Sequence, residues 1–292
     1  MKRALIMLGL LTAGAVLATM GTPDRRVELA SVFDFWHDVL RDADQVTLKA
    51  TRVSDAEEMK LGNDLAQSLL RSYTEDPALS AYVGDVASRL VPGVTRKGIQ
   101  YHFHVIDSLG INAFALPGGQ IFVLRGLLNF VQSEAELASV VGHEISHVDL
   151  RHCIEHYQYE LRLGKSVEFL HTIATSGFGA TQESEADAEG ERLAVQAGYD
   201  PQAASNLFWR MKREFGEPTR TPAATPAGEV SKTVGTALGN FFRSHPPSED
   251  RAVALGSVAN RFRGQTFYVG KQNLQSKIAR AKQQYPGEFR KL

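Results

Sequence analysis

Two histidines four residues apart, with a glutamate directly after the first, form the most informative pattern in this sequence. They are His143, Glu144 and His147, in the segment VGHEISHVDLRH. On an α-helix, side chains four residues apart project from the same face, so both imidazole rings can reach one metal ion. The pattern is typical of zinc hydrolases, because zinc binds imidazole nitrogen at about 2.0–2.1 Å and lowers the pKa of a bound water to about 7. Glu144 lies beside this face, where its carboxylate can take the proton of that water without binding the metal.

The same five-residue pattern also arises by chance in helices whose histidines pack in a core or face solvent. Here the surrounding segment has strong helical periodicity, and the apolar residues Ala138, Val141 and Ile145 indicate a buried setting. A zinc site also needs a third protein ligand. The choice between the two interpretations therefore depends on the rest of the sequence.

One possible third ligand would follow on the same chain segment. In the metzincin pattern the helix ends at a glycine three residues after the second histidine, and a third histidine follows three residues later. The corresponding residues here are Leu150 and Cys153. We therefore expect the helix that starts at Ser133 to continue to about residue 164, and the metzincin arrangement to be absent. Cys153 is the only cysteine, which excludes an internal disulfide, and we expect it to be a small buried side chain.

The second possibility is a glutamate from a later helix, which the pattern predicts over about residues 182–197. Glu183 and Asp187 lie four residues apart on one face of that helix. Glu183 can bind zinc while Asp187 accepts a hydrogen bond from the free ring nitrogen of a ligand histidine. Glu185 points about 200° away from Glu183, so we expect it in solvent. Acidic residues at a helix start usually compensate the helix dipole, and only their pairing with the two histidines favours a ligand role.

Several motifs in a fixed order resemble a known family over roughly residues 55–255. They are EEMKLG, DPALSAYV, NAFALPGGQIFVLRGLL, ELASVVGHEISHVDLRH, ESEAD and HPPSEDR. The sequence is similar to the gluzincin peptidases that include the HtpX-type membrane proteases, the CAAX prenyl endoproteases and the BepA-like periplasmic proteases. The resemblance implies that His143 and His147 bind zinc and that Glu144 is the general base. It also implies that Glu183 is the third ligand and that Asp187 supports the site.

A late His-Pro…Arg element of this family matches His245, Pro246 and Arg251. The resemblance implies that His245 can approach the metal and hold the enzyme inactive, as in BepA-like members. Two alternatives stay open: His245 can help to stabilise the oxyanion, or it can be a surface loop residue beside two prolines. Arg251 is expected to orient this loop or the helix of the third ligand.

The chain departs from many members of the family in two respects. It lacks the several internal membrane spans of the HtpX and CAAX types, which favours a soluble or once-anchored peptidase. It also shows no tetratricopeptide array after the catalytic part, unlike BepA. Recruitment of partners through such repeats is therefore not expected.

Capping and turn signals predict the elements that must position the site. Ser54 begins a capping box before a helix, and Pro77 is the first residue of the next helix. Alternating apolar residues predict strands at 99–107 and 120–124, with a Pro-Gly-Gly turn before the second strand. We therefore expect an α+β, mostly helical, zincin-like domain with a small β-sheet and the His-Glu-x-x-His helix at its active site.

The predicted organisation has four parts. Residues 1–21 are a signal peptide or membrane anchor, residues 22–54 a connecting segment, residues 55–257 the zinc metallopeptidase domain and residues 258–292 a C-terminal extension. Within the domain, the segment 216–240 is rich in Pro, Gly, Thr and Ala, which predicts a surface loop.

The N-terminal segment gives information about the cellular location of the protein. Lys2 and Arg3 precede an uncharged apolar run over residues 4–20, which is typical of a secretion signal or a membrane anchor. The sequence does not decide between cleavage and retention, because the run is short for a spanning helix and lacks a clean cleavage site. Either form places the rest of the chain outside the cytoplasm, periplasmic or membrane-associated. The alternative, an N-terminal core helix, is disfavoured because no polar face interrupts the run.

The remaining histidines and the charge balance give less information about function than the motifs above. We interpret His152 and His156 as surface or packing residues, and His102 and His104 share one strand face without a carboxylate neighbour in sequence. Lysine and arginine (32) nearly balance aspartate and glutamate (33), so no global field points to nucleic acid.

The sequence thus predicts a zinc endopeptidase, with one Zn²⁺ per chain, that cleaves unfolded or extended polypeptides in envelope protein quality control. A strand of NAFALPGGQIFVL beside the metal can pair with an extended substrate, although it can equally be an interior strand. The alternative function is a chaperone-like or assembly-factor protein that uses the same fold and cleaves little.

Overall fold

The computed structural model describes residues 52–162, 178–215, 245 and 249–292. The predicted signal or anchor segment, residues 1–21, and the predicted loop 216–240 lie outside these ranges. Within the described ranges, no helix has both the length and the apolar character needed to span a bilayer.

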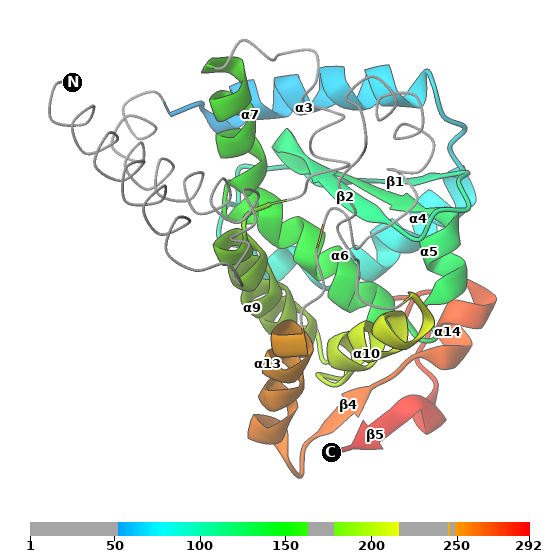
Figure 1. Cartoon of the computed structure of the whole chain (residues 1–292). Helices are drawn as coiled ribbons and strands as arrows, with labels where there is room; N and C mark the ends of the chain where they lie inside the picture. Colours follow the sequence, from blue (N-terminus) through cyan, green and yellow to red (C-terminus); the bar gives the residue numbers. More distant parts are fainter. Residues whose placement is uncertain (1–51, 163–177, 216–244, 246–248) are drawn as a thin grey trace, which may run out of the picture. The chain divides into compact units, whose positions relative to one another are not determined.

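The described residues form the predicted α+β, mostly helical fold (Figure 1). The α-helices are α3 (Asp55–Leu70), α4 (Pro77–Ala87), α5 (Arg125–Phe130), α6 (Glu134–Asp149), α7 (His152–Arg162), α9 (Ala180–Gln196), α10 (Ala203–Phe215), α13 (Glu249–Ala259) and α14 (Lys271–Ser276). The strands are β1 (His102–Ile106), β2 (Ala113–Leu116), β3 (Gln120–Leu124), β4 (Thr266–Tyr268) and β5 (Phe289–Lys291). Single 3₁₀ turns lie at Val91–Gly93, Pro117–Gly119, Asn260–Phe262 and Pro286–Glu288.

The larger sheet has the strand order β1-β3-β2, with β3 parallel to β1 and antiparallel to β2. The turn between β2 and β3 contains Gly118, whose φ of 72° lies in the left-handed region that glycine adopts at little cost. A Cβ at this position would also lie 2.5 Å from the backbone oxygen of Glu58 in α3. The predicted Pro-Gly-Gly turn is thus confirmed, and β2 is an edge strand.

Helices cover both faces of this sheet. Phe114 and Phe122 belong to an apolar cluster with α3, whereas Ala113 and Val123 belong to the main core together with Ile145 of α6. The alternation follows from the two-residue period of a strand. Figure 1 shows the result, with α3 and α6 on opposite sides of the sheet.

The helix that carries the two candidate ligands is shorter than expected. It ends at Asp149, and a new helix, α7, begins at His152. Between them Arg151 has a φ of 70°, a conformation that L-residues rarely adopt. Its guanidinium donates to Val53 O at 2.8 Å and lies 3.5 Å from Asp55 Oδ1, so contacts distant in sequence stabilise the break. The prediction of one helix continuing to about residue 164 is therefore wrong.

Tyr199 and residues after α13 form hydrogen bonds with the N-terminal end of α6. Glu134, which is fully buried, accepts hydrogen bonds from Tyr199 Oη at 2.7 Å and from Arg280 N at 2.9 Å. Its own backbone N–H donates to Gly270 O. The residues after α13 therefore pack against the same helix that carries the metal-binding pattern, and the boundary placed between residues 257 and 258 stays a prediction.

Candidate metal centre

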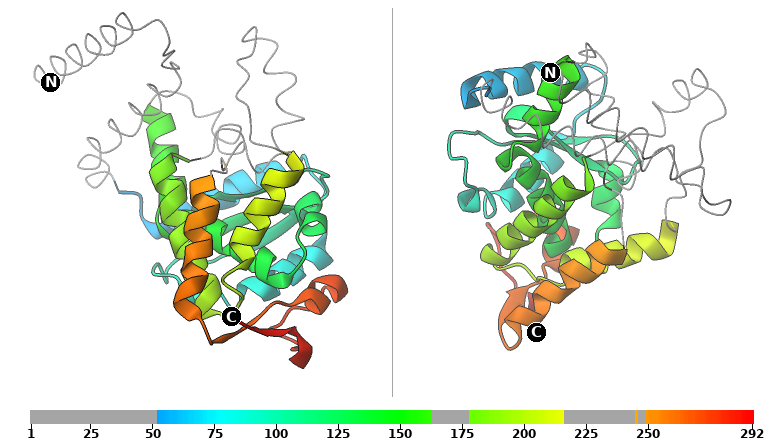
Figure 2. Two further views of the ribbon diagram at one scale, coloured as in Figure 1. Left: turned by 60° about the horizontal axis from the view of Figure 1, so that its bottom comes forward. Right: turned by 60° about the vertical axis from the view of Figure 1, so that its left-hand side comes forward.

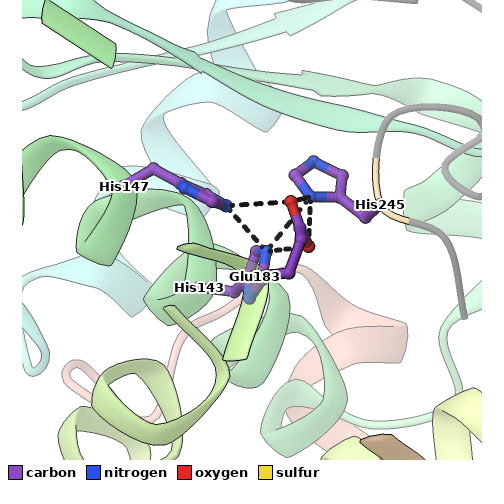
Figure 3. A group of neighbouring side chains, drawn as sticks. All are labelled: His143, His147, Glu183 and His245. Carbon is purple, nitrogen blue, oxygen red and sulfur yellow. Dashed lines mark hydrogen bonds and ion pairs between the residues drawn. The ribbon is translucent and has the colours of Figure 1, made fainter. Parts of the chain in front are cut away.

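Four buried side chains from three parts of the chain meet at one point (Figure 3). His143 and His147 come from α6, Glu183 from the first turn of α9, and His245 from the segment before α13. One ligand atom from each lies within 4.8 Å of all the others. The two histidines and the glutamate that the sequence singled out are therefore together in the folded chain.

The separations between these three side chains fit a tetrahedral metal site. His143 Nε2 lies 3.0 Å from His147 Nε2, 3.5 Å from one Glu183 carboxylate oxygen, and His147 Nε2 lies 3.6 Å from the other. Two ligands held 2.0–2.1 Å from a tetrahedral ion lie about 3.3 Å apart. Two imidazole nitrogens and one carboxylate oxygen are also a donor set that suits a divalent transition metal.

A close helix crossing brings Glu183 to the histidines. At Gly142 and Gly190 the backbones of α6 and α9 come into direct contact: a Cβ on Gly190 would lie 2.7 Å from His143 N and 2.9 Å from His143 Cα. A Cβ on Gly142 would lie 3.0 Å from Gly190 O. No motif in the sequence marks this pair, but a glycine inside each helical segment is a signal of close packing.

Asp187 and Arg251, which carry opposite charges, lie next to the candidate ligands. Arg251 belongs to α13, which lies beside α9 in Figure 2. Asp187 Oδ1 lies 3.1 Å from His143 Nδ1, the ring nitrogen on the side away from the cluster. Arg251 donates to both oxygens of Asp187, at 2.6 and 2.8 Å, and its Nη2 lies 3.0 Å from Glu183 Oε2. Asp187 and Arg251 thus lie directly beside the candidate ligands, and the supporting role that the resemblance implies for them stays a prediction.

Burial and these carboxylates set the electrostatics of the centre. Burial alone would lower the pKa of His143, but hydrogen bonds to Asp187 and Glu183 outweigh it and raise that pKa to about 10. Burial and the neighbouring His143 hold the pKa of His147 well below its ordinary value. The carboxylates therefore favour one cationic charge at this place, which a bound metal ion can supply.

Glu144 is fully buried beside the cluster and is not one of its four members. Its Oε1 lies 3.3 Å from His245 Nε2, and burial raises the pKa of its carboxyl group above the ordinary value. A carboxyl group with a raised pKa, close to a metal but not bound to it, is suited to accept and return a proton.

His245 fills the space between the three ligands and Glu144. Its Nδ1 lies 3.2 Å from His143 Nε2 and 3.0 Å from the Glu183 carboxylate, while its Nε2 faces Glu144. The side chain is almost completely buried, so the alternative of a surface loop residue is wrong. His245 thus supplies a fourth donor atom to the cluster, beside those of the two histidines and Glu183.

Two further side chains, neither of them predicted from the sequence to belong to the site, contact His147. His152 Nδ1 lies 3.0 Å from His147 Nδ1, and the Phe178 ring stacks on the His147 ring with 3.9 Å between centroids. His152 was expected at the surface or in packing, and it is buried. Glu185 was expected in solvent; it is half exposed and lies 3.1 Å from His152 Nε2.

Comparison with known proteins identifies the family to which this chain is similar. The model of peptidase family M48 matches residues 77–259, a range that contains all four members of the cluster. The chain is 25% identical over 261 residues to the beta-barrel assembly-enhancing protease of Escherichia coli (strain K12), which covers 78% of this chain and 50% of that protein. It is 31% identical over 179 residues to the mitochondrial metalloendopeptidase OMA1 of Arabidopsis thaliana, covering 56% of this chain and 32% of that protein.

A further match is the metalloendopeptidase OMA1, mitochondrial, of Bos taurus, 36% identical over 152 residues, which is 44% of this chain and 28% of that protein. The chain thus spans half the length, or less, of these curated relatives. The family match covers more than half of the chain and includes the His/Glu cluster. The chain belongs to peptidase family M48.

Proposed function

We propose that the chain is a zinc endopeptidase that cleaves unfolded or extended polypeptides outside the cytoplasm, in protein quality control of the cell envelope. The observation that carries this proposal is the position of Glu144 beside three side chains whose donor atoms lie 3.0–3.6 Å apart, as the ligands of a tetrahedral ion do. Zinc suits the site because it accepts two imidazoles and one carboxylate and leaves one position open in catalytic centres.

Each side chain around the site has a separate role in the proposed hydrolysis of a peptide bond. Zinc would polarise the scissile carbonyl and lower the pKa of the attacking water. Glu144 takes the proton of that water and passes it to the leaving amine. Asp187 holds the ring of His143 through Nδ1, and Arg251 holds the carboxylates of Asp187 and Glu183 in place.

The position of β2 at the edge of the larger sheet is a reason to propose an extended polypeptide as the substrate. β2 lies at the end of the strand order and contacts α6, the helix of the two histidines. Asn112 O, just before β2, accepts from Leu124 N of β3, so the two-residue alternation directs the backbone groups of Ala113 and Ala115 away from β3. β2 is buried, Ala113 N donates to Asn112 Oδ1 and Ala115 O accepts from Cys153 Sγ. An extended peptide would have to displace these contacts to pair with this edge and place its scissile bond near the metal.

Two observations support the envelope setting and the quality-control role. The basic residues Lys2 and Arg3 before an apolar run favour export or anchoring. The name of the Escherichia coli relative refers to β-barrel assembly.

We further propose that His245 is an internal inhibitor of the site. Its imidazole lies among the ligands and contacts Glu144, so with a metal bound it would take the fourth ligand position and exclude water and substrate until the ring moves. This closed arrangement is also the observation that favours the second candidate function, a chaperone-like or assembly-factor protein with little proteolysis.

Casein cleavage by the purified chain tests both proposals. We expect the wild type to cleave slowly, with cleavage abolished by a chelator and restored by zinc. His245→Ala is expected to cleave faster, because the water position opens; if the open form is about one tenth of the wild-type population, the gain is about tenfold.

The exposed His102 on β1 provides the matched control, since His102→Ala leaves the site untouched. Decreased cleavage by His245→Ala would instead assign His245 a catalytic role, and unchanged cleavage would refute both roles. Chelator-insensitive cleavage would contradict the metal mechanism, and no cleavage by wild type or variant would favour the binding protein.

A further inference from the structure

His152 is a buried histidine that the proposed reaction does not use. It is the first residue of α7 and is 3% exposed. In an uninterrupted helix, residues five apart project about 140° apart, so His152 would point away from His147. The break at Arg151, with its φ of 70°, turns the chain and brings the two rings within hydrogen-bonding distance.

The ring nitrogens of His147 have separate partners. Its Nε2 faces His143 and Glu183, as a metal ligand must, and its Nδ1 lies 3.0 Å from His152 Nδ1. A neutral imidazole that gives its Nε2 lone pair to a metal carries its proton on Nδ1. His147 Nδ1 is therefore the donor of this hydrogen bond, and His152 Nδ1 is the acceptor.

Nε2, the other ring nitrogen of His152, continues the hydrogen bonds in the same donor-to-acceptor direction. Because its Nδ1 accepts, the proton of a neutral His152 is on Nε2, which lies 3.1 Å from Glu185 Oε2. His147 thus donates to His152, and His152 donates to the carboxylate of Glu185. The Phe178 ring, stacked on His147 at an interplanar angle of 18°, fixes the plane in which the ligand ring lies.

We propose that His152 is a positioning residue for the metal ligand His147, fixing its tautomer and ring orientation through the hydrogen bond between the two Nδ1 atoms. This inference rests on the proposed metal site. The two ligand histidines then have different hydrogen-bond partners. His143 contacts the carboxylate of Asp187 directly, whereas His147 is connected to the carboxylate of Glu185 through the imidazole of His152.

Two substitutions separate positioning from simple filling of the core. In His152→Asn the side-chain oxygen lies where Nδ1 was and can still accept from His147, whereas His152→Leu fills the space without an acceptor. His156→Leu, one turn further along α7, is the matched control because its ring centroid, like that of His152, lies 6.0 Å from the centroid of the Phe178 ring. Glu185→Gln keeps an acceptor for His152 Nε2.

Zinc affinity of the full chain, measured by competition with a chelator of known affinity, tests the inference. Visible absorption of the cobalt-loaded protein reports the ligand geometry, and thermal unfolding of the metal-free protein reports folding. We expect His152→Leu to weaken zinc binding about 10–100-fold and to alter the cobalt spectrum. His152→Asn, Glu185→Gln and His156→Leu are expected to stay within about threefold of the wild type, well short of the loss at a ligand-supporting group.

Equal zinc affinity of His152→Leu and wild type would overturn the inference, and so would an equal loss in His152→Asn and His152→Leu. If His152→Leu does not fold, His152→Asn decides alone: wild-type affinity and spectrum support the acceptor role, and a 10–100-fold loss contradicts it. A wild-type chain that binds no zinc would instead refute the proposed metal site itself.

Discussion

Replacement of Glu144 by glutamine is expected to leave metal binding intact and to reduce peptide hydrolysis by about 10²–10⁴-fold. The amide has nearly the same shape as the carboxylate but cannot take a proton from water. Metal binding is expected to survive because Glu144 is not among the four members of the cluster. The measurement is kcat/KM on a quenched fluorescent peptide, with the zinc content of the same preparation.

Glu214→Gln, an exposed position on α10, is the matched control for the loss of one carboxylate. In the background of His245→Ala the expected loss is the same, because the proton acceptor is missing whether or not the ring is displaced. Cleavage by Glu144→Gln at the wild-type rate would rule out Glu144 as the base. Loss of zinc together with activity would show that Glu144 helps to hold the metal.

Alanine in place of Gly190 is expected to separate the third ligand from the two histidines. The added Cβ would lie 2.7 Å from His143 N, and the obstructing atoms belong to the backbone, which cannot rotate away. Helix α9 must therefore shift relative to α6, and Glu183, two turns before Gly190, shifts with it. We expect a loss of about 1–3 kcal/mol in the free energy of unfolding and a fall of at least about tenfold in zinc affinity.

Gly287→Ala is the control for the substitution itself, because a Cβ there meets no atom within 4 Å. Zinc titration and thermal unfolding of the two variants distinguish a local effect on the site from general loss of stability. Wild-type zinc affinity in Gly190→Ala would show that the glycine crossing does not set the position of Glu183.

The sequence could predict the parts of this site that depend on local rules. The spacing of His143 and His147 places them on one face of any helix, and the Ser133 cap, whose side chain accepts from Glu136 N, fixes where that helix begins. Glu183 could be predicted because the two histidines require a further ligand, and Glu183 and Asp187, four residues apart on one helix face, suit a ligand and its support.

The parts that sequence reasoning missed depend on contacts between distant segments. The helix break after Asp149 contains neither glycine nor proline, and Arg151 adopts its unusual conformation because its guanidinium reaches Val53. The place of His152 follows from that break and was therefore missed as well. His245 lies 62 residues from Glu183 in the chain, so only the family resemblance, and no local pattern, suggested that it approaches the metal.

Zinc content of the purified full-length chain after dialysis tests the central claim most directly, when wild type and Glu183→Ala are measured side by side. If two histidines and one glutamate hold a single catalytic ion, the wild type retains one zinc per chain and Glu183→Ala loses most of it. Equal zinc in the two proteins would exclude Glu183 as a ligand, and a wild type without zinc would contradict the proposed centre.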